Sequence, residues 1–181
     1  MPRLFVALRP PHPIREHLRE LMTGVPGARW QDDAQLHLTL RYIGEVDGRM
    51  VEEVAAVLAE VRAPTIEARL AGVGAFSRRE RVHTLWAGVA PQEPIRRLFR
   101  KVDRALVRLG MEPEPRAFVP HITVARLALA ANATVETIRW QLDHAAFAST
   151  AFAFPQLSLY ESHLQAEGAE YREIGSWRLR D

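Results

Sequence analysis

The chain has 181 residues, 48% of them hydrophobic, so it is long enough to bury one sizeable core or two small lobes that share one. Its 24 basic residues nearly balance its 22 acidic ones, so the net charge supplies no strong field for nucleic acid. Cysteine is absent, which excludes disulfides and thiolate zinc sites. No apolar run approaches the roughly 20 residues of a membrane helix. We therefore expect a cytoplasmic protein without membrane contact.

The first part of the chain alternates predicted strands and helices. Apolar or alternating runs predict strands over 4–8, 36–44 and 65–76. Helical spacing of apolar residues predicts helices over 10–25 and 48–61.

The second part repeats this order. Strands are predicted over 84–90, 118–127 and 150–162, and helices over 94–110 and 134–146, with a last strand over 170–179. His121 follows His37 by 84 residues. We interpret the chain as one domain, 1–181, in which repeats 1–78 and 82–160 form two lobes and 170–179 closes the fold. The predicted class is α+β: a bilobal, pseudo-twofold fold in which helix pairs back antiparallel sheets and a cleft lies between the lobes.

Each repeat carries a histidine, one residue and then a threonine: "HLT" at 37–39 and "HIT" at 121–123. On a strand, residues i and i+2 point to the same face. Each strand is therefore predicted to present an imidazole beside a hydroxyl, and a pseudo-twofold axis brings both pairs to one cleft. One such motif is a weak signal, whereas two in matching places of a repeat are a strong one.

Two histidines and two threonines suit acid–base attack on phosphorus. Because histidine titrates near neutral pH, one ring can accept a proton while the other donates one. Threonine hydroxyls can bond the non-bridging oxygens of a phosphoryl transition state. No HxH, HExxH or His–Asp pair accompanies the motifs, so we expect neither a metal nor a cofactor.

The sequence resembles the 2H phosphoesterase superfamily, specifically its RNA 2′,3′-cyclic phosphodiesterases (the LigT-like, or 2′-5′ RNA ligase, proteins). The stretches that carry the resemblance span nearly the whole chain: "LFVAL", "ARWQDDAQLHLTLRYIGEV", "GVGAFSRRERVHTLWAGV", "PEPRAFVPHITVAR" and "LYESHLQAEGAEYREIGSWRL". The resemblance implies hydrolysis of a terminal 2′,3′-cyclic phosphate on RNA or tRNA-fragment ends to a 2′-phosphate. It also implies joining of RNA ends through a 2′-5′ bond in some members. We expect a monomer.

The resemblance also assigns roles. His37 would be the proton donor to the leaving oxygen and His121 the proton acceptor that activates water. Thr39 and Thr123 would hold phosphate oxygens, and Arg126 occupies the place where the family often has an arginine near the phosphate. Since Arg126 has the opposite strand parity to His121, it reaches the cleft only if the strand ends or bulges there.

Other residues are weaker candidates. Arg41 shares strand parity with His37, so it is a candidate for lining the cleft. Four aromatic residues are candidates for stacking a terminal base, each against the alternative of core or rim packing: Phe5, Trp30, Tyr42 and Phe76.

Two alternatives to RNA-end hydrolysis stay open at this point. One is the same chemistry on a small cyclic nucleotide, which would show no preference for oligonucleotides. The other is a binding module that holds a nucleotide or RNA without turnover, although such a module does not need a matched acid and base.

Overall fold

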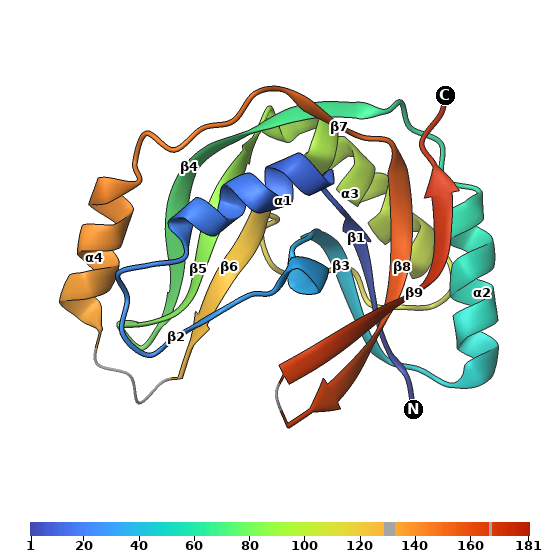
Figure 1. Ribbon diagram of the computed structural model, residues 1–181. Helices are drawn as coiled ribbons and strands as arrows, with labels where there is room; N and C mark the ends of the chain where they lie inside the picture. The colour runs from blue at the N-terminus through green and yellow to red at the C-terminus, as the bar shows by residue number, and fades with distance from the viewer. Residues whose placement is uncertain (129–132, 167) are drawn as a thin grey trace.

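The computed structural model describes residues 1–128, 133–166 and 168–181. The structure has two antiparallel sheets, one on each side of the molecule (Figure 1). The first has four strands in the order β3 (Leu38–Glu45), β1 (Arg3–Leu8), β8 (Gln156–Gln165) and β9 (Gly168–Arg178). The second has five, in the order β2 (Ala28–Trp30), β6 (His121–Leu127), β5 (Arg81–Ala90), β4 (Ile66–Arg78) and β7 (Phe152–Phe154).

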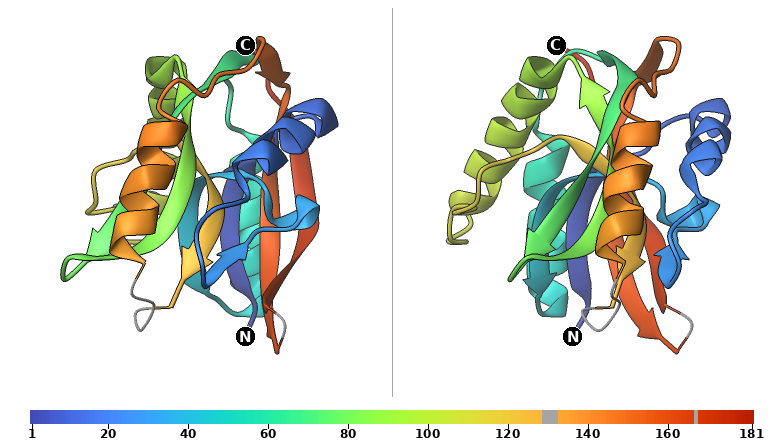
Figure 2. Two further views of the ribbon diagram at one scale, coloured as in Figure 1. Left: turned by 60° about the vertical axis from the view of Figure 1, so that its left-hand side comes forward. Right: turned by 90° about the vertical axis from the view of Figure 1, so that its left-hand side faces the viewer.

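Helices α4 (Thr134–Asp143) and α2 (Gly48–Ala59) lie on the two outer sides of the molecule, whereas α1 (His12–Leu18) crosses in front of the space between the sheets (Figures 1 and 2). On the side of the four-stranded sheet, α2 contacts β9 and α3 (Gln92–Val107), and α3 contacts β3. On the other side, α4 packs on β4 and β5. The helix α1 continues into the 3₁₀ turn η1 (Arg19–Leu21), whose last carbonyl accepts a hydrogen bond from the Trp140 indole of α4. The predicted α+β class with two antiparallel sheets is confirmed.

Each sheet combines strands from both sequence repeats. Strand β4 ends the first repeat but pairs with β5 of the second, and β8 ends the second repeat but pairs with β1 of the first. The chain changes sheets at Pro155, between β7 and β8, where proline supplies no N–H to a ladder. The repeats 1–78 and 82–160 therefore exchange their last strands, so neither sheet is built from one repeat alone.

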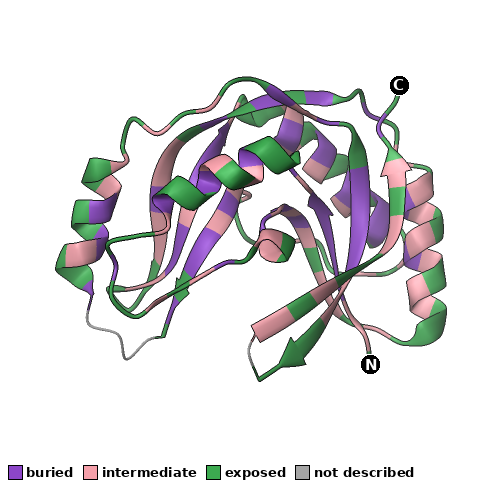
Figure 3. Ribbon diagram, in the orientation of Figure 1, coloured by how far each residue is buried: buried purple, intermediate pink, exposed green. Residues whose placement is uncertain are grey.

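The local sequence explains where two of the helices begin. Helix α2 begins after Asp47, whose side chain accepts a hydrogen bond from the backbone N–H of Met50 at 2.8 Å. This N-cap satisfies one of the N–H groups of the first turn that have no partner within the helix. Helix α3 begins after Pro91 and buries one apolar stripe, made of Ile95, Leu98, Val102, Ala105 and Leu106. Buried residues run along the strands of both sheets, and the hydrophobic cluster they form includes residues of both (Figure 3).

Candidate active site

The first motif lies at the start of β3. His37 comes one residue before the strand and Thr39 lies within it. The Nε2 atom of His37 is 3.0 Å from the Thr39 hydroxyl oxygen, so the expectation that the two side chains share a face is confirmed. The backbone of Gln35 accepts a second hydrogen bond from the imidazole. Gln35 ends the short 3₁₀ turn η2 (Asp33–Gln35), whose capping box with Asp32 holds this segment in place.

The second motif opens β6. The Nδ1 atom of His121 is 2.6 Å from the carbonyl oxygen of Val119. A carbonyl oxygen only accepts, so Nδ1 carries the proton and Nε2 of the neutral ring is left with its lone pair. Strands β3 and β6 belong to different sheets but contact one another, which brings the two motifs together.

A one-residue bulge follows each motif at the same place. In β3, Thr39 pairs with Ala7 and Arg41 with Val6, so Leu40 is the extra residue. In β6 the extra residue is Val124, three residues after the histidine, as Leu40 is in β3. A bulge of this kind shifts the alternation of side chains by one residue.

Both bulges change which side chains reach the site. In β6 the partners of Thr123 and Arg126 are Trp86 and Thr84, which are two residues apart and therefore share a face. Arg126 thus lies on the face of His121 and Thr123. Strand parity allowed Arg126 to reach the cleft only if the strand ended or bulged, and the bulge at Val124 meets this condition.

Arg41, a candidate for lining the cleft, is directed elsewhere for the same reason. Beyond the bulge at Leu40 its side chain leaves the face of His37, and its guanidinium instead pairs with Asp103 of α3 at 2.9 Å and with Glu114 at 3.2 Å. This partly buried ion pair joins β3 to the helix behind it and to the segment that follows the helix.

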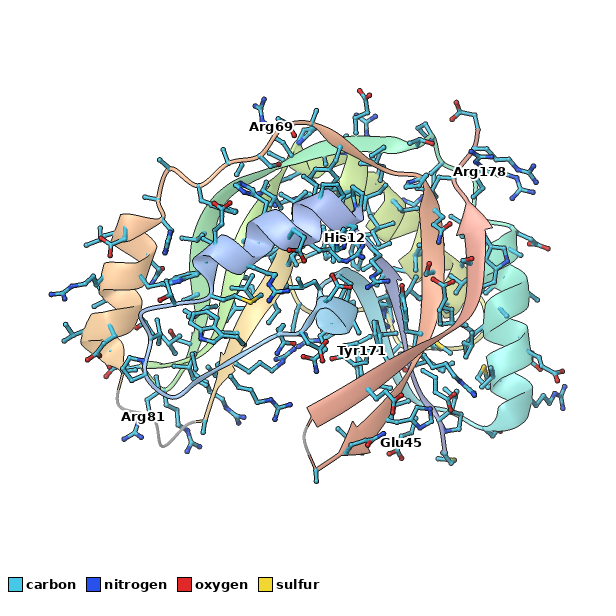
Figure 4. All side chains as sticks on the ribbon, in the orientation of Figure 1. His12, Glu45, Arg69, Arg81, Tyr171 and Arg178 are labelled. Carbon is cyan, nitrogen blue, oxygen red and sulfur yellow. The ribbon has the colours of Figure 1, made fainter. Side chains whose placement is uncertain are left out.

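Aromatic rings enclose both histidines. The His37 ring stacks on Phe5 with centroids 4.9 Å apart and meets the edge of Tyr171 at 5.2 Å. The His121 ring meets Phe76 edge-on at 4.9 Å and Trp86 at 5.8 Å. Tyr171 reaches from β9 toward the centre of the molecule beside η2 (Figure 4). The imidazoles are thus fixed by packing as well as by hydrogen bonds.

Burial lowers the pKa of both imidazoles. The pKa of His37 falls to about 4, first because burial disfavours the charged ring and then because the positive charges of Arg126, His121 and Arg9 repel a proton. The pKa of His121 is lowered by burial and by the charge of Arg126. Arg126 therefore acts electrostatically on both histidines, and both rings are neutral at pH 7 in the unliganded protein.

A pocket of about 360 Å³ opens between the sheets beside the motifs. Thr39 and His121 line it together with residues from both sheets and from the segment after α3: Leu40, Tyr42, Phe76, His83, Glu114, Arg116, Ala117, Phe118 and Val119. His37, Thr123 and Arg126 are not among its lining residues. The structure thus joins His37 to Thr39 by a hydrogen bond, joins Thr39 to His121 through the pocket, and aligns Thr123 and Arg126 with His121 on β6.

One group of metal-ligating side chains is found in the described part of the chain, and it contains neither motif histidine. Its members are His12, Glu16 and Asp33. The Asp33 carboxylate already accepts hydrogen bonds from Arg9 at 3.0 Å and Arg15 at 2.8 Å. These cations compete with a metal ion for the same oxygens, so the group has the character of an ion-pair cluster.

Some residues at the site were not singled out by the sequence pattern. Tyr171, Trp86 and Gln35 have no motif around them, and β2, whose three residues pair with β6, is too short for periodicity to predict. The alternation "EYRE" indicates a strand at Tyr171 but not which strand lies beside it. Only the pairing of β9 with β8, and of β8 with β1, places this ring against His37.

Comparison with known proteins agrees with this architecture. The family model described as the 2′-5′ RNA ligase superfamily matches residues 8–165. The chain belongs to this superfamily. The resemblance read from the two motifs is confirmed.

Relatives of this family are found in archaea and bacteria. An RNA 2′,3′-cyclic phosphodiesterase of Aeropyrum pernix is 39% identical over 111 residues, covering 61% of this chain and 62% of that protein. The chain therefore spans less than two thirds of that relative in the alignment. A protein of the same name from Methanocaldococcus jannaschii is 26% identical over 181 residues, covering 97% of this chain and 99% of its own.

Solved structures of the family share the fold. The crystal structure of Escherichia coli LigT complexed with 3′-AMP matches with a TM-score of 0.81 at 25% identity, covering 100% of both chains. The crystal structure of TT0787 of Thermus thermophilus matches with the same TM-score and identity, covering 98% of each chain.

No helix in the described ranges is long and apolar enough to cross a membrane.

Proposed function

We propose that this protein hydrolyses the 2′,3′-cyclic phosphate at the end of RNA or of tRNA fragments to a 2′-phosphate. The observation that carries the proposal is the pair of HxT motifs, each fixed by a hydrogen bond to backbone and each followed by a bulge, with Arg126 acting on both imidazoles. The relatives named RNA 2′,3′-cyclic phosphodiesterase support the choice of substrate.

The reaction uses two proton transfers. The Nε2 lone pair of His121 accepts a proton from water as the water oxygen attacks phosphorus opposite the ribose 3′ oxygen. The P–O3′ bond breaks, and protonated His37 donates to the departing oxygen. The product carries a 2′-phosphate and a free 3′ hydroxyl. Thr39, Thr123 and Arg126 stabilise the charge on the non-bridging oxygens. Joining of RNA ends uses the same centre, with a 5′ hydroxyl in place of water.

When substrate binds, the site takes up from solvent the proton that this scheme needs. Both imidazoles are neutral at pH 7 in the free protein, whereas a bound phosphate anion favours imidazolium and raises the pKa of the adjacent ring. We expect a nucleoside 2′-phosphate to bind with uptake of up to one proton near pH 7. By linkage, its affinity should fall by up to tenfold per pH unit between the pKa of the free ring and the pKa of the complex, and should become independent of pH above the latter. Calorimetry in two buffers of different ionisation enthalpy measures the uptake, which His37→Ala should reduce. Binding with no proton uptake contradicts the scheme.

Phosphorus NMR of the reaction product tests the function directly. The substrate is an RNA oligonucleotide that ends in 2′,3′-cyclic phosphate, with EDTA present. A 2′-phosphate monoester is the expected product. A 3′-phosphate would mean that the other ribose oxygen leaves. Nucleotide binding without turnover would assign the chain to the binding modules. Equal efficiency on a cyclic mononucleotide and an oligonucleotide would favour the small-substrate alternative.

A further inference from the structure

The segment between α3 and the second motif, residues 112–120, forms no helix or strand, yet it belongs to the site. Its Val119 carbonyl accepts the hydrogen bond from Nδ1 of His121, at 2.6 Å. Five of its residues line the 360 Å³ pocket: Glu114, Arg116, Ala117, Phe118 and Val119. The place of this segment therefore decides how the second imidazole is oriented and which of its nitrogens carries the proton.

Backbone hydrogen bonds do not fix this segment. Outside the helices and strands, no backbone-to-backbone hydrogen bond joins residues 112–120 to any other described part of the chain. Three of its nine residues are prolines, which have no N–H to donate. Side chains must therefore hold it in place. At its far end, the ring of Phe118 stacks on Phe99 of α3 with centroids 4.5 Å apart.

The guanidinium of Arg41 holds the start of the segment. It donates to the backbone carbonyl of Glu112 at 2.5 Å and to the carboxylate of Glu114 at 3.2 Å. It also donates to the Asp103 carboxylate of α3 at 2.9 Å, and the same carboxylate oxygen accepts from the backbone N–H of Glu114 at 3.2 Å. One side chain thus ties β3 both to α3 and to the segment that leads to His121.

This network is more enclosed than a surface ion pair. The side-chain exposed fractions are 10% for Arg41, 17% for Asp103 and 12% for Glu114. The pair of Arg3 and Glu45, at the end of the same strand, is exposed by 39% and 47%. Solvent and salt therefore screen the Arg41 network less. The planar fork of arginine can donate to three groups in fixed directions, whereas lysine offers one compact ammonium.

We propose that Arg41 is a positioning residue for the reaction. It holds residues 112–119 against β3, and thereby places the Val119 carbonyl that keeps the Nε2 lone pair of His121 available. This inference rests on the proposed function, in which that lone pair accepts a proton from water. The bulge at Leu40 turns Arg41 out of the site and toward α3. The strand of the first motif thus orients the histidine of the second.

Replacement of Arg41 by methionine tests this role, since methionine keeps apolar length without a donor. We expect Arg41→Met to lower kcat on an RNA 2′,3′-cyclic phosphate by about 10–100-fold, the scale of a small misplacement of a reacting group, with KM changed much less. Imidazole ¹⁵N NMR is the second readout. The parent should show His121 protonated at Nδ1, and Arg41→Met should show a mixture with the Nε2-protonated ring. Arg41→Lys should recover only part of the rate.

The controls separate positioning from loss of stability. Val54→Ala creates a cavity in the core face of α2 and should lower the melting temperature without changing kcat or the His121 tautomer. Arg3→Met removes the exposed ion pair on β3 and should also change neither. All rates are compared well below the melting temperatures of the variants.

Three results would count against these assignments. A parent-like kcat in Arg41→Met would overturn the role of Arg41. A lower kcat with His121 still fully protonated at Nδ1 would overturn it as well, because the segment would then hold its place without the guanidinium. No hydrolysis by the parent would overturn the proposed function instead, and the NMR comparison would still decide whether Arg41 positions His121.

Discussion

Replacement of either motif histidine by alanine is expected to lower kcat on an RNA 2′,3′-cyclic phosphate by about 10²–10⁴-fold. His121→Ala removes the lone pair that accepts the proton of water, and His37→Ala removes the proton for the leaving oxygen. Because both side chains act in the transition state, KM should change much less than kcat. Steady-state kinetics on the oligonucleotide measures both. His163→Ala, on β8 beside Glu161 and outside the motifs, should retain the parent rate.

The two histidines can be told apart by the leaving group. Sulfur in place of the bridging 3′ oxygen leaves as a thiolate, which needs no proton because a thiol is far more acidic than an alcohol. With this substrate, the defect of His37→Ala should shrink to below about tenfold, while His121→Ala stays slow. The opposite pattern would exchange the roles of acid and base. A defect below about tenfold in both variants with the natural substrate would remove the two histidines from the chemistry.

The sequence was sufficient for the parts of the site that depend on local spacing. A residue two positions from a histidine shares its face on any strand, so the contact of His37 with Thr39 follows from the motif alone. The number of long helices and most strand positions follow in the same way from apolar periodicity.

The parts that depend on pairing between distant strands were not predictable in this way. A bulge is defined by its partner strand, so the extra residues Leu40 and Val124 cannot be found by counting along one strand. Parity therefore left Arg41 as a candidate for the cleft, whereas its guanidinium pairs with Asp103 and Glu114, and it made the place of Arg126 conditional. The exchange of β4 and β8 between sheets has the same origin, because the pattern of a buried strand does not identify its neighbours.

The two halves of the site share these nonlocal features and differ in one residue at equivalent positions. The motifs are equivalent in sequence, and both bulges occur three residues after the histidine. The difference lies at the position that each bulge turns back into the site, where one repeat has Tyr42 and the other Arg126. The two motifs therefore share a histidine, a threonine and a bulge, and differ in the charge of the side chain that follows the bulge.

Arg126 is the cation whose charge acts on both motif histidines. We expect Arg126→Gln to lower kcat/KM by about 10²–10³-fold, the loss typical of one preorganised group that stabilises transition-state charge. The change has a second consequence, since the charge of Arg126 lowers the pKa of both His37 and His121. Without that charge both pKa values rise. The acid limb of the kcat/KM profile, where His121 must be neutral to act as base, should move to higher pH.

Arg126→Lys distinguishes the charge from the geometry of the guanidinium. Lysine keeps the positive charge but not the planar fork that binds two oxygens at once. The acid limb should therefore stay near that of the parent while the rate falls. Arg139→Gln, an exposed position of α4, is the matched control for loss of one surface charge and should change neither quantity. An acid limb that does not move in Arg126→Gln would mean that the guanidinium does not act on the imidazoles, and Arg126 would then be a surface cation brought to this face by the bulge without a part in the reaction.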